Sequence, residues 1–197
     1  MKRSHIVVVS SLIFALAIIN ARTVGAQTTV YQKWDTEDDG IVIWAGGTYA
    51  IPQIHNGDLL CTSMQSAHNY PTSRFILILV KDLRPGDEIS GMATCQPLSD
   101  IKMLAGYWGQ NDTLYNEYVF PDPWFYSFAG TTFSQVVPEG AESVALSAVV
   151  IAGPYLSTHF YIDSLEVTVP DHATVYLPDG TVPTRTETLG GIKALYR

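Results

Sequence analysis

Four carboxylates stand close together near the start of the chain, in the segment Asp35-Thr36-Glu37-Asp38-Asp39-Gly40. Calcium takes six to eight oxygen ligands, and clustered carboxylates supply several of them. The spacing of the acids and the glycine imitates the start of an EF-hand loop. Gly46, however, occupies the twelfth position, where a bidentate glutamate is required, and no flanking helix is expected. An EF-hand is therefore excluded, and a calcium site of another kind or a solvated acidic turn remains.

Aromatic residues beside polar turns form a second candidate site. Sugars present apolar CH faces, so a protein site stacks Trp or Tyr against them and adds polar side chains for the hydroxyl groups. The segments YWGQND (107–112) and PWFY (123–126) have this composition, and Trp108 is expected to be exposed beside its turn. The expected lining of a glycan site is Trp108, Tyr107, Trp124, Tyr126 and Asn111. The alternative is that tryptophans fill the core, as we expect of Trp34 and Trp44.

The two cysteines, Cys61 and Cys95, form the third chemical feature. In an oxidising compartment such a pair is most simply a disulfide. A closed loop of roughly 35 residues would stabilise the fold by about 3–4 kcal/mol in the chain-entropy model. The alternative is two buried free thiols.

The compartment is indicated by residues 1–26, which resemble a secretory signal peptide. Lys2 and Arg3 precede an apolar run over 6–19, and small residues at Val24-Gly25-Ala26 offer a cleavage site. The run is shorter than the roughly 20 residues of a membrane-spanning helix. We therefore expect a secreted, extracellular or cell-surface protein, without a membrane span in the mature chain.

The charge balance excludes one class of partner. Eleven basic residues oppose 19 acidic ones, which gives a net charge of −8. Removal of the leader takes away Lys2, Arg3 and Arg22, leaving eight basic against 19 acidic residues and a charge of −11. This balance argues against a nucleic-acid partner.

The elements that must position these residues are strands. Short apolar or alternating runs are separated by turn residues, and no amphipathic helical window of ordinary length occurs. The pattern predicts an all-β antiparallel β-sandwich of about nine strands. The runs lie at 41–44, 59–64, 74–80, 88–95, 101–108, 115–120, 124–137, 143–151 and 158–169.

The domain is expected to cover residues 27–177, with a last strand possible at 171–176. Residues 178–197 read as a linker, rich in Pro, Gly and Thr, followed by a C-terminal tail. The tail ends in LGGIKALYR (189–197), which is either a frayed terminus or a short helix that docks on an export or surface partner.

Four segments, in this order, resemble jelly-roll carbohydrate-binding modules of the galactose-binding-domain-like superfamily. The first runs from Trp34 to Gly40 and is followed by Trp44, and the second is the turn 83–90, LRPGDEIS. The third is 133–140, with Val144 and Leu146, and the fourth is 160–165, FYIDSL. The resemblance covers about 27–169 and implies a jelly-roll fold that binds carbohydrate.

The same resemblance implies a structural Ca²⁺ that ties the first strand to the last. By position in the motifs, the carboxylates would come from Glu37 and Asp163, with Asp35 as a further ligand. This chain departs from the family pattern at Ser164, where a second Asp is usual, and at Thr36, where an aromatic residue is usual.

An enzyme alternative follows from a weaker resemblance. Gln53-Ile54-His55 and AGYWGQ (105–110) are similar to segments of secreted jelly-roll alginate lyases, in which a His and a Tyr exchange protons during β-elimination. Here Trp108 displaces the tyrosine and leaves Tyr107 on the opposite strand face.

The leading prediction is therefore a non-catalytic module that binds a polysaccharide or another glycan. A structural or adhesive surface module without a sugar site is the second interpretation, and a polysaccharide lyase is the third.

Overall fold

The computed structural model describes residues 26–183 except for 37–38, 48–49, 65–70, 98, 119–124 and 128–131. For 125–127 and 181–183 it describes the backbone only. Almost all of the expected leader and residues 184–197 of the expected tail lie outside the described residues. Within the described part of the chain, no helix has the length and apolar character of a membrane span.

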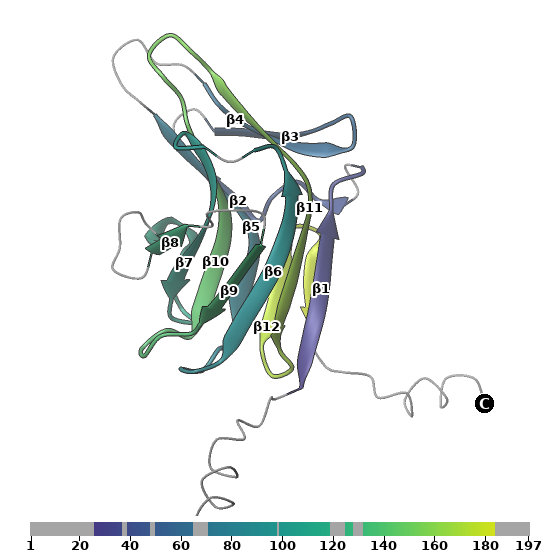
Figure 1. Ribbon diagram of the computed structural model, residues 1–197, viewed down its shortest axis with the longest axis vertical. Helices are drawn as coiled ribbons and strands as arrows, with labels where there is room; N and C mark the ends of the chain where they lie inside the picture. The colour runs from purple at the N-terminus through teal and green to yellow at the C-terminus, as the bar shows by residue number, and fades with distance from the viewer. Residues whose placement is uncertain are drawn as a thin grey trace, which may run out of the picture.

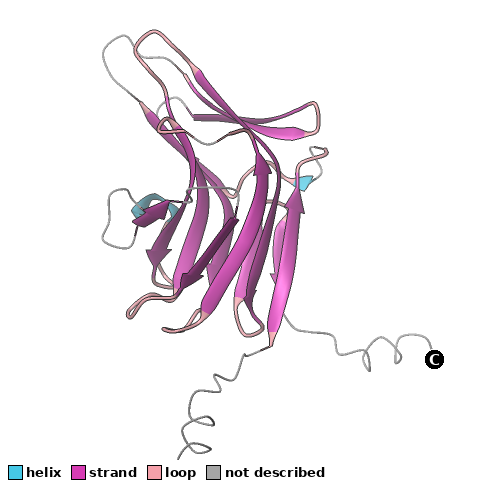
Figure 2. Ribbon diagram, viewed as in Figure 1, coloured by secondary structure: helices cyan, strands magenta, loops and turns pink. Residues whose placement is uncertain are grey.

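The described chain folds into two antiparallel sheets that face each other (Figures 1 and 2). The first sheet has six strands: β3 (Ala50–His55), β4 (Asp58–Ser63), β11 (Thr158–Pro170), β6 (Glu88–Cys95), β9 (Thr132–Val136) and β1 (Gln27–Lys33). The second sheet has seven: β13 (Gly180–Pro183), β12 (Thr174–Leu177), β5 (Thr72–Lys81), β10 (Ser143–Ile151), β7 (Lys102–Gly109), β8 (Phe125–Ser127) and β2 (Trp44–Gly46).

The strand order is that of a jelly roll. Strands β4-β11-β6-β9 of the first sheet face β5-β10-β7-β8 of the second, and the chain passes from sheet to sheet as it proceeds. This is the double Greek key of an eight-stranded jelly roll. The predicted all-β jelly-roll sandwich is therefore confirmed, with added strands at the edges of both sheets.

Strand β11 organises the first sheet because three strands pair with it. Its first half pairs with β4 from Thr158 to Ile162, and its second half pairs with β1, from Ser164 to Pro170. Strand β6 lies along the other edge. The β3–β4 hairpin and the start of β11 project together beyond the body of the sandwich (Figure 1).

The core fills the space between the sheets. Trp34 is fully buried there, and its indole Nε1 donates to the carbonyl oxygen of Ile41 at 2.9 Å, so its expected core role is confirmed. A second apolar cluster covers the outer face of the second sheet, with Ile76, Tyr107 and Tyr118 buried and Trp44 packed against them. Strand β5 is consequently buried on both faces, as its continuous apolar run predicts.

The structure corrects several element assignments. Strands β1 and β3 were not expected, because β1 is largely polar and β3 contains Pro52. The run 115–120 is not a strand where it is described, since Tyr115–Glu117 forms a short 3₁₀ helix. Beyond Leu177, where the domain is expected to end, β13 pairs with β12 and extends the sheet to Pro183.

The predicted disulfide is wrong in this structure, where Cys61 and Cys95 are free. Cys61 of β4 pairs with Phe160 of β11, whereas Cys95 of β6 pairs with Ile162 on the other edge of β11. Two strand spacings separate them, about 9.5 Å. Bridged cysteines have Cα atoms less than roughly 7 Å apart, so the strand between them prevents the bond.

Candidate functional site

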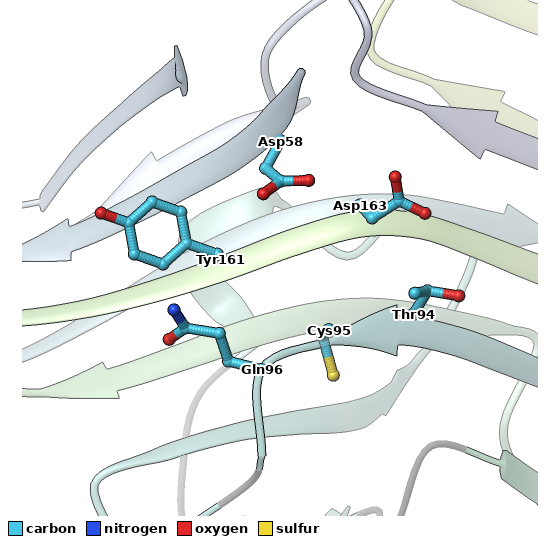
Figure 3. Close-up of a pocket in the computed structure, with 6 residues that line it drawn as sticks. All are labelled: Asp58, Thr94, Cys95, Gln96, Tyr161 and Asp163. Atoms are coloured by element: carbon cyan, nitrogen blue, oxygen red, sulfur yellow. The ribbon is translucent and has the colours of Figure 1, made fainter. Parts of the chain in front are cut away.

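A hollow of about 210 Å³ lies on the outer face of the first sheet, beside β11. Figure 3 shows Asp58 on one side of β11, Tyr161 and Asp163 on the strand itself, and the β6 residues on the other side. We call it the Tyr161 hollow. Its lining residues are Asp58, Thr94, Cys95, Gln96, Tyr161 and Asp163.

Alternation along β11 directs two of these side chains outward. Phe160 and Ile162 are buried in the core, so Tyr161 between them faces away from it. The pairing of β11 with β6 is irregular between Ile162 and Ser164, where Asp163 has no register partner. Such an irregularity re-aims a side chain, and it places Asp163 beside Tyr161 in the hollow.

The β3–β4 hairpin supplies Asp58. Its turn is Asn56-Gly57, and both residues have positive φ, 55° and 87°. That conformation is typical of the two-residue turn that matches the twist of a hairpin, and Asn-Gly is its preferred sequence. The turn sets His55 opposite Asp58 at the first pair of the hairpin.

The end of β6 supplies the remaining side chains. The backbone N–H of Gln96 donates to the carbonyl oxygen of Tyr161 at 3.0 Å, which fixes the end of β6 against β11. Lys102 Nζ donates to Gln96 Oε1 at 3.2 Å, so the amide group of Gln96 is held in place. The hollow therefore has residues held by backbone hydrogen bonds to β11 on both sides of Tyr161.

The polar groups of the hollow are suited to hydrogen bonding with hydroxyl groups. Tyr161 is half-buried, and its ring lies 6.2 Å from the His55 ring at an angle of 51°. Asp163 Oδ2 accepts a hydrogen bond from Ser164 Oγ at 2.9 Å. Among the described residues, neither Asp58 nor Asp163 forms an ion pair. An aromatic ring thus stands beside carboxylate and amide groups, which are acceptors and donors for a polar ligand.

Cys95 also lines the hollow, but its environment does not suit a nucleophile. Burial raises the pKa of the Cys95 thiol, and the nearby charge of Lys102 only partly opposes that shift. Since the thiolate is the reactive form, a raised pKa lowers reactivity at neutral pH.

A second hollow, of about 460 Å³, lies at the end of β7. We call it the Trp108 hollow. Its lining residues are Trp108, Gly109, Gln110, Thr113, Glu117, Gly140 and Ala141. The expectation that Trp108 is exposed is wrong, because only 8% of it is accessible and it belongs to the core cluster. The indole nevertheless forms part of the lining, beside polar groups from Gln110 and Thr113.

The other expected ligand residues are not gathered around Trp108. Tyr107 is only 2% exposed, on the outer face of the second sheet, with the guanidinium carbon of Arg74 4.9 Å from its ring centre. Asn111 is bound to Asp82: its Oδ1 accepts from the Asp82 N–H at 2.9 Å and its Nδ2 donates to Asp82 Oδ1 at 3.2 Å. Trp124 and the side chain of Tyr126 lie outside the described residues.

The residues of the lyase alternative are not brought together. His55 lies on the first sheet, in contact with Tyr161, whereas Tyr107 is buried on the outer face of the second sheet. Outer faces of the two sheets point to opposite sides of a sandwich, so these residues cannot share a substrate proton.

The expected calcium ligands are placed only in part. Strand β1 pairs with β11 up to Lys33 opposite Ser164, so the chain beyond β1 continues near Asp163. Asp35 is exposed and lies 3.9 Å from Lys33 Nζ, and Glu37 is outside the described residues. The described residues include no group of three or more His, Cys, Asp or Glu that would hold a metal ion.

Sequence reasoning missed Asp58, Gln96 and Tyr161 as site residues. The signal available for Tyr161 was the alternation of 158–169, which places Tyr161 on the face opposite Phe160 and Ile162. Asp58 and Gln96 carried no such signal, because their approach to Tyr161 depends on the pairing of strands distant in sequence.

In comparisons with known proteins, this chain resembles others only in the path of its backbone. No family model and no curated protein matches the sequence. Six solved chains have a similar backbone path, among them the following three. A xylan-binding module, CBM86, from Roseburia intestinalis has a TM-score of 0.36 and 12% identity, with 73% of this chain and 95% of that chain covered.

A family 29 carbohydrate-binding module from Piromyces equi has a TM-score of 0.34 and 11% identity, with 75% of this chain and 92% of that chain covered. A glycosylation-associated protein complex, Gap123, from Streptococcus agalactiae has a TM-score of 0.44 and 12% identity. There, 71% of this chain matches only 44% of the other, so this chain spans less than half of that protein. At such identities and scores, these similarities assign no function.

Proposed function

We propose that this chain is a non-catalytic module that binds a polysaccharide through the Tyr161 hollow. The observation that carries the proposal is a half-buried tyrosine ring flanked by Asp58, Asp163 and Gln96 in one hollow. An aromatic face covers the CH groups of a sugar, and carboxylate and amide groups bind its hydroxyls.

The size and position of the hollow agree with binding at a surface. About 210 Å³ is below the usual range of roughly 300–1,000 Å³ for small-molecule sites, so the hollow would hold a single sugar residue of a longer chain. It lies on the outer face of a sheet, where a polymer is able to continue past it in both directions.

The sequence adds three parts to this proposal. The leader at 1–26 supports secretion, which would place the module where polysaccharides occur. The four segments that resemble the galactose-binding-domain-like modules support membership of that superfamily. The tail within 178–197 would dock on an export or surface partner.

The Trp108 hollow is a second candidate place for the sugar. Trp108 lines it together with Gln110, Thr113 and Glu117, and the sequence places Trp124 and Tyr126 among the expected ligand residues. Tyr107 and Asn111 have no part in this hollow, since one is buried and the other is bound to Asp82.

A glycan array probed with the full chain tests the proposal and locates the site. We expect Tyr161→Ala to lose binding, because it removes the stacking ring, while Trp108→Ala retains it. Tyr31→Ala is the matched control: Tyr31 is 51% exposed on strand β1 of the same sheet and does not line the hollow.

Three outcomes are distinct. Loss of binding in Tyr161→Ala alone supports the proposed site. Loss in Trp108→Ala alone, in a variant whose melting curve shows that it is folded, moves the site to the Trp108 hollow. Absence of binding to every neutral, cationic and anionic glycan contradicts the proposed function and leaves a structural or adhesive module.

A further inference from the structure

The charge of the Tyr161 hollow limits which sugar fits it. Its lining contains two carboxylates, Asp58 and Asp163, and no Lys or Arg. Among the described residues, the only hydrogen bond to either carboxylate comes from the hydroxyl of Ser164 to Asp163 Oδ2. Both carboxylates thus face the hollow with acceptor positions to fill.

One cation stands at the edge of the hollow, because Lys102 Nζ binds the lining residue Gln96, whereas Lys33 is paired outside it. Lys102 Nζ donates to Gln96 Oε1 at 3.2 Å, and Lys33 Nζ lies 3.9 Å from Asp35. His55 is the cross-strand neighbour of Asp58, and its Nε2 lies 3.2 Å from Asn56 Nδ2. The lining and its neighbour Lys102 thus bring together two carboxylates and one ammonium group, so the hollow carries an excess of negative charge.

A negative, partly enclosed hollow discriminates among sugar substituents. A uronate would bring a third carboxylate against Asp58 and Asp163, which is repulsive. A protonated amine would be attracted to both, and it would also be favoured near the face of the Tyr161 ring. An N-acetylated amine has no charge, so it is not attracted to Asp58 and Asp163. Its larger volume also makes it fit the hollow less readily.

We infer that the Tyr161 hollow prefers an amino sugar with a free, protonated amine, such as a glucosamine residue of a polysaccharide. The inference rests on the proposed function and specifies its ligand class. The ammonium group would lie between Asp58 and Asp163, with the sugar ring against Tyr161 and a hydroxyl near Gln96.

Calorimetric titration of the full chain with three oligosaccharides of equal length tests the inference. The ligands are oligomers of glucosamine, of N-acetylglucosamine and of a uronic acid, in a buffer with EDTA at about pH 6. We expect glucosamine oligomers to bind about tenfold more tightly than the N-acetylated ones, and the uronate not to bind. Added salt should reduce this preference, because it screens partly exposed charges.

Variants separate the charge effect from sugar binding in general. Asp58→Asn and Asp163→Asn should each bring the two amino-sugar oligomers close to equal affinity while keeping the side-chain shape. Asp179→Asn, at the exposed β12–β13 turn, is the matched control and should leave the preference unchanged. Melting curves confirm that each variant is folded.

Equal or tighter binding of the N-acetylated or uronate oligomers overturns the inference while the proposed function stands. A preference for glucosamine that survives both Asp58→Asn and Asp163→Asn also overturns it. If none of the three oligomers binds, and neutral glucans and xylans do not bind either, the proposed function itself is contradicted.

Discussion

At the scale of single residues, Cys61 and Cys95 both pack with the core cluster, from strands on opposite edges of β11. Burial raises the pKa of both thiols, most strongly for Cys61, which is completely buried. Cys95 is half-buried and lines the Tyr161 hollow. The two thiols should therefore differ in their reactivity rather than form a bond with each other.

Thiol labelling followed by intact-mass measurement tests this difference. In the native protein, we expect a maleimide to modify Cys95 slowly and to leave Cys61 unmodified, whereas both react after unfolding. The rate at Cys95 should increase with pH, because a raised pKa leaves little thiolate at neutral pH. A native protein that accepts no label and has lost two hydrogen atoms would instead contain the disulfide.

Tyr107 gives a residue-scale prediction about alkaline stability. Burial raises the pKa of Tyr107 to about 12, although the positive charge of Arg74 opposes the shift. The unfolded phenol has a pKa of about 10, so above that pH the unfolded state loses its proton first. The free energy of unfolding should then fall with increasing pH, by about 1 kcal/mol at pH 11.

Urea unfolding at about pH 8 and pH 11 measures this loss in the wild type and in Tyr107→Phe. We expect the variant to lose less stability between the two pH values, because it has no phenol to ionise at that position. Tyr118, whose pKa burial also raises, remains in both proteins, so its effect cancels in the comparison. Equal losses in both proteins would contradict the raised pKa of Tyr107.

At the scale of elements, the close approach of β6, β11 and β9 depends on Gly91. A Cβ at this position would meet the carbonyl oxygen of Glu166 on β11 and lie 2.6 Å from the Phe133 ring of β9. We expect Gly91→Ala to lower the free energy of unfolding by about 1–3 kcal/mol, as overpacking does. Gly153→Ala is the control, because the nearest atom to its added Cβ would be Leu156 Cβ at 3.8 Å. Comparable losses in both variants, by chemical denaturation, would show that the close approach is not the cause.

The hairpin formed by β12 and β13 gives a second element-scale prediction. Strand β12 pairs with β5 on one side and with β13 on the other, from Thr174 opposite Pro183 to Leu177 opposite Gly180. A chain that ends after Leu177 leaves β12 as an unpaired edge. Its melting temperature should be roughly 2–4 °C below that of a chain that ends after Pro183, for a loss of about 1 kcal/mol. Identical melting curves would show that β13 does not stabilise the sheet.

The sequence predicts the bounds of three strands, β5, β6 and β10, to within two residues. The predicted bounds of β6 and β10 agree with the structure. Strand β5 begins two residues before its predicted run and ends one residue after it. Strand β1 was missed because only Val30 and Gln32 of its side chains are buried, so its hydrophobic alternation is weak. The site could not be predicted because it forms only through strand pairing: Asp58, Gln96 and Tyr161 meet only when β4, β6 and β11 lie together.

At the scale of the whole molecule, the two outer faces differ in character. The second sheet carries a buried apolar cluster on its outer face, so that face is already covered. The upper part of the first sheet instead presents exposed or half-buried polar residues, among them Gln53, His55, Gln96 and Asp163. This asymmetry favours the first sheet as the binding face and agrees with the position of the Tyr161 hollow.

Strand β1, the first of the chain, pairs with β11, and a cation at this junction would strengthen the closure of the fold. Strand β1 pairs with β11 from Gln27 opposite Pro170 to Lys33 opposite Ser164, so the chain leaves β1 close to Asp163. A calcium ion held by Glu37 and Asp163, with Asp35, would offset the repulsion among these carboxylates. Since such an ion binds the folded state alone, it should raise the melting temperature.

Melting curves of the full chain in millimolar Ca²⁺ and in EDTA test this closure. A Ca²⁺ concentration ten times the dissociation constant adds about 1.4 kcal/mol, which corresponds to roughly 3–5 °C for a chain of this size. Glu37→Gln and Asp163→Asn should each abolish the shift, whereas Asp179→Asn should keep it. Mg²⁺ should replace Ca²⁺ poorly, because it requires a stricter octahedral geometry. If the melting temperature is the same in Ca²⁺ and EDTA, strands β1 and β11 are held by backbone pairing and core packing alone, and the acidic segment is a solvated turn.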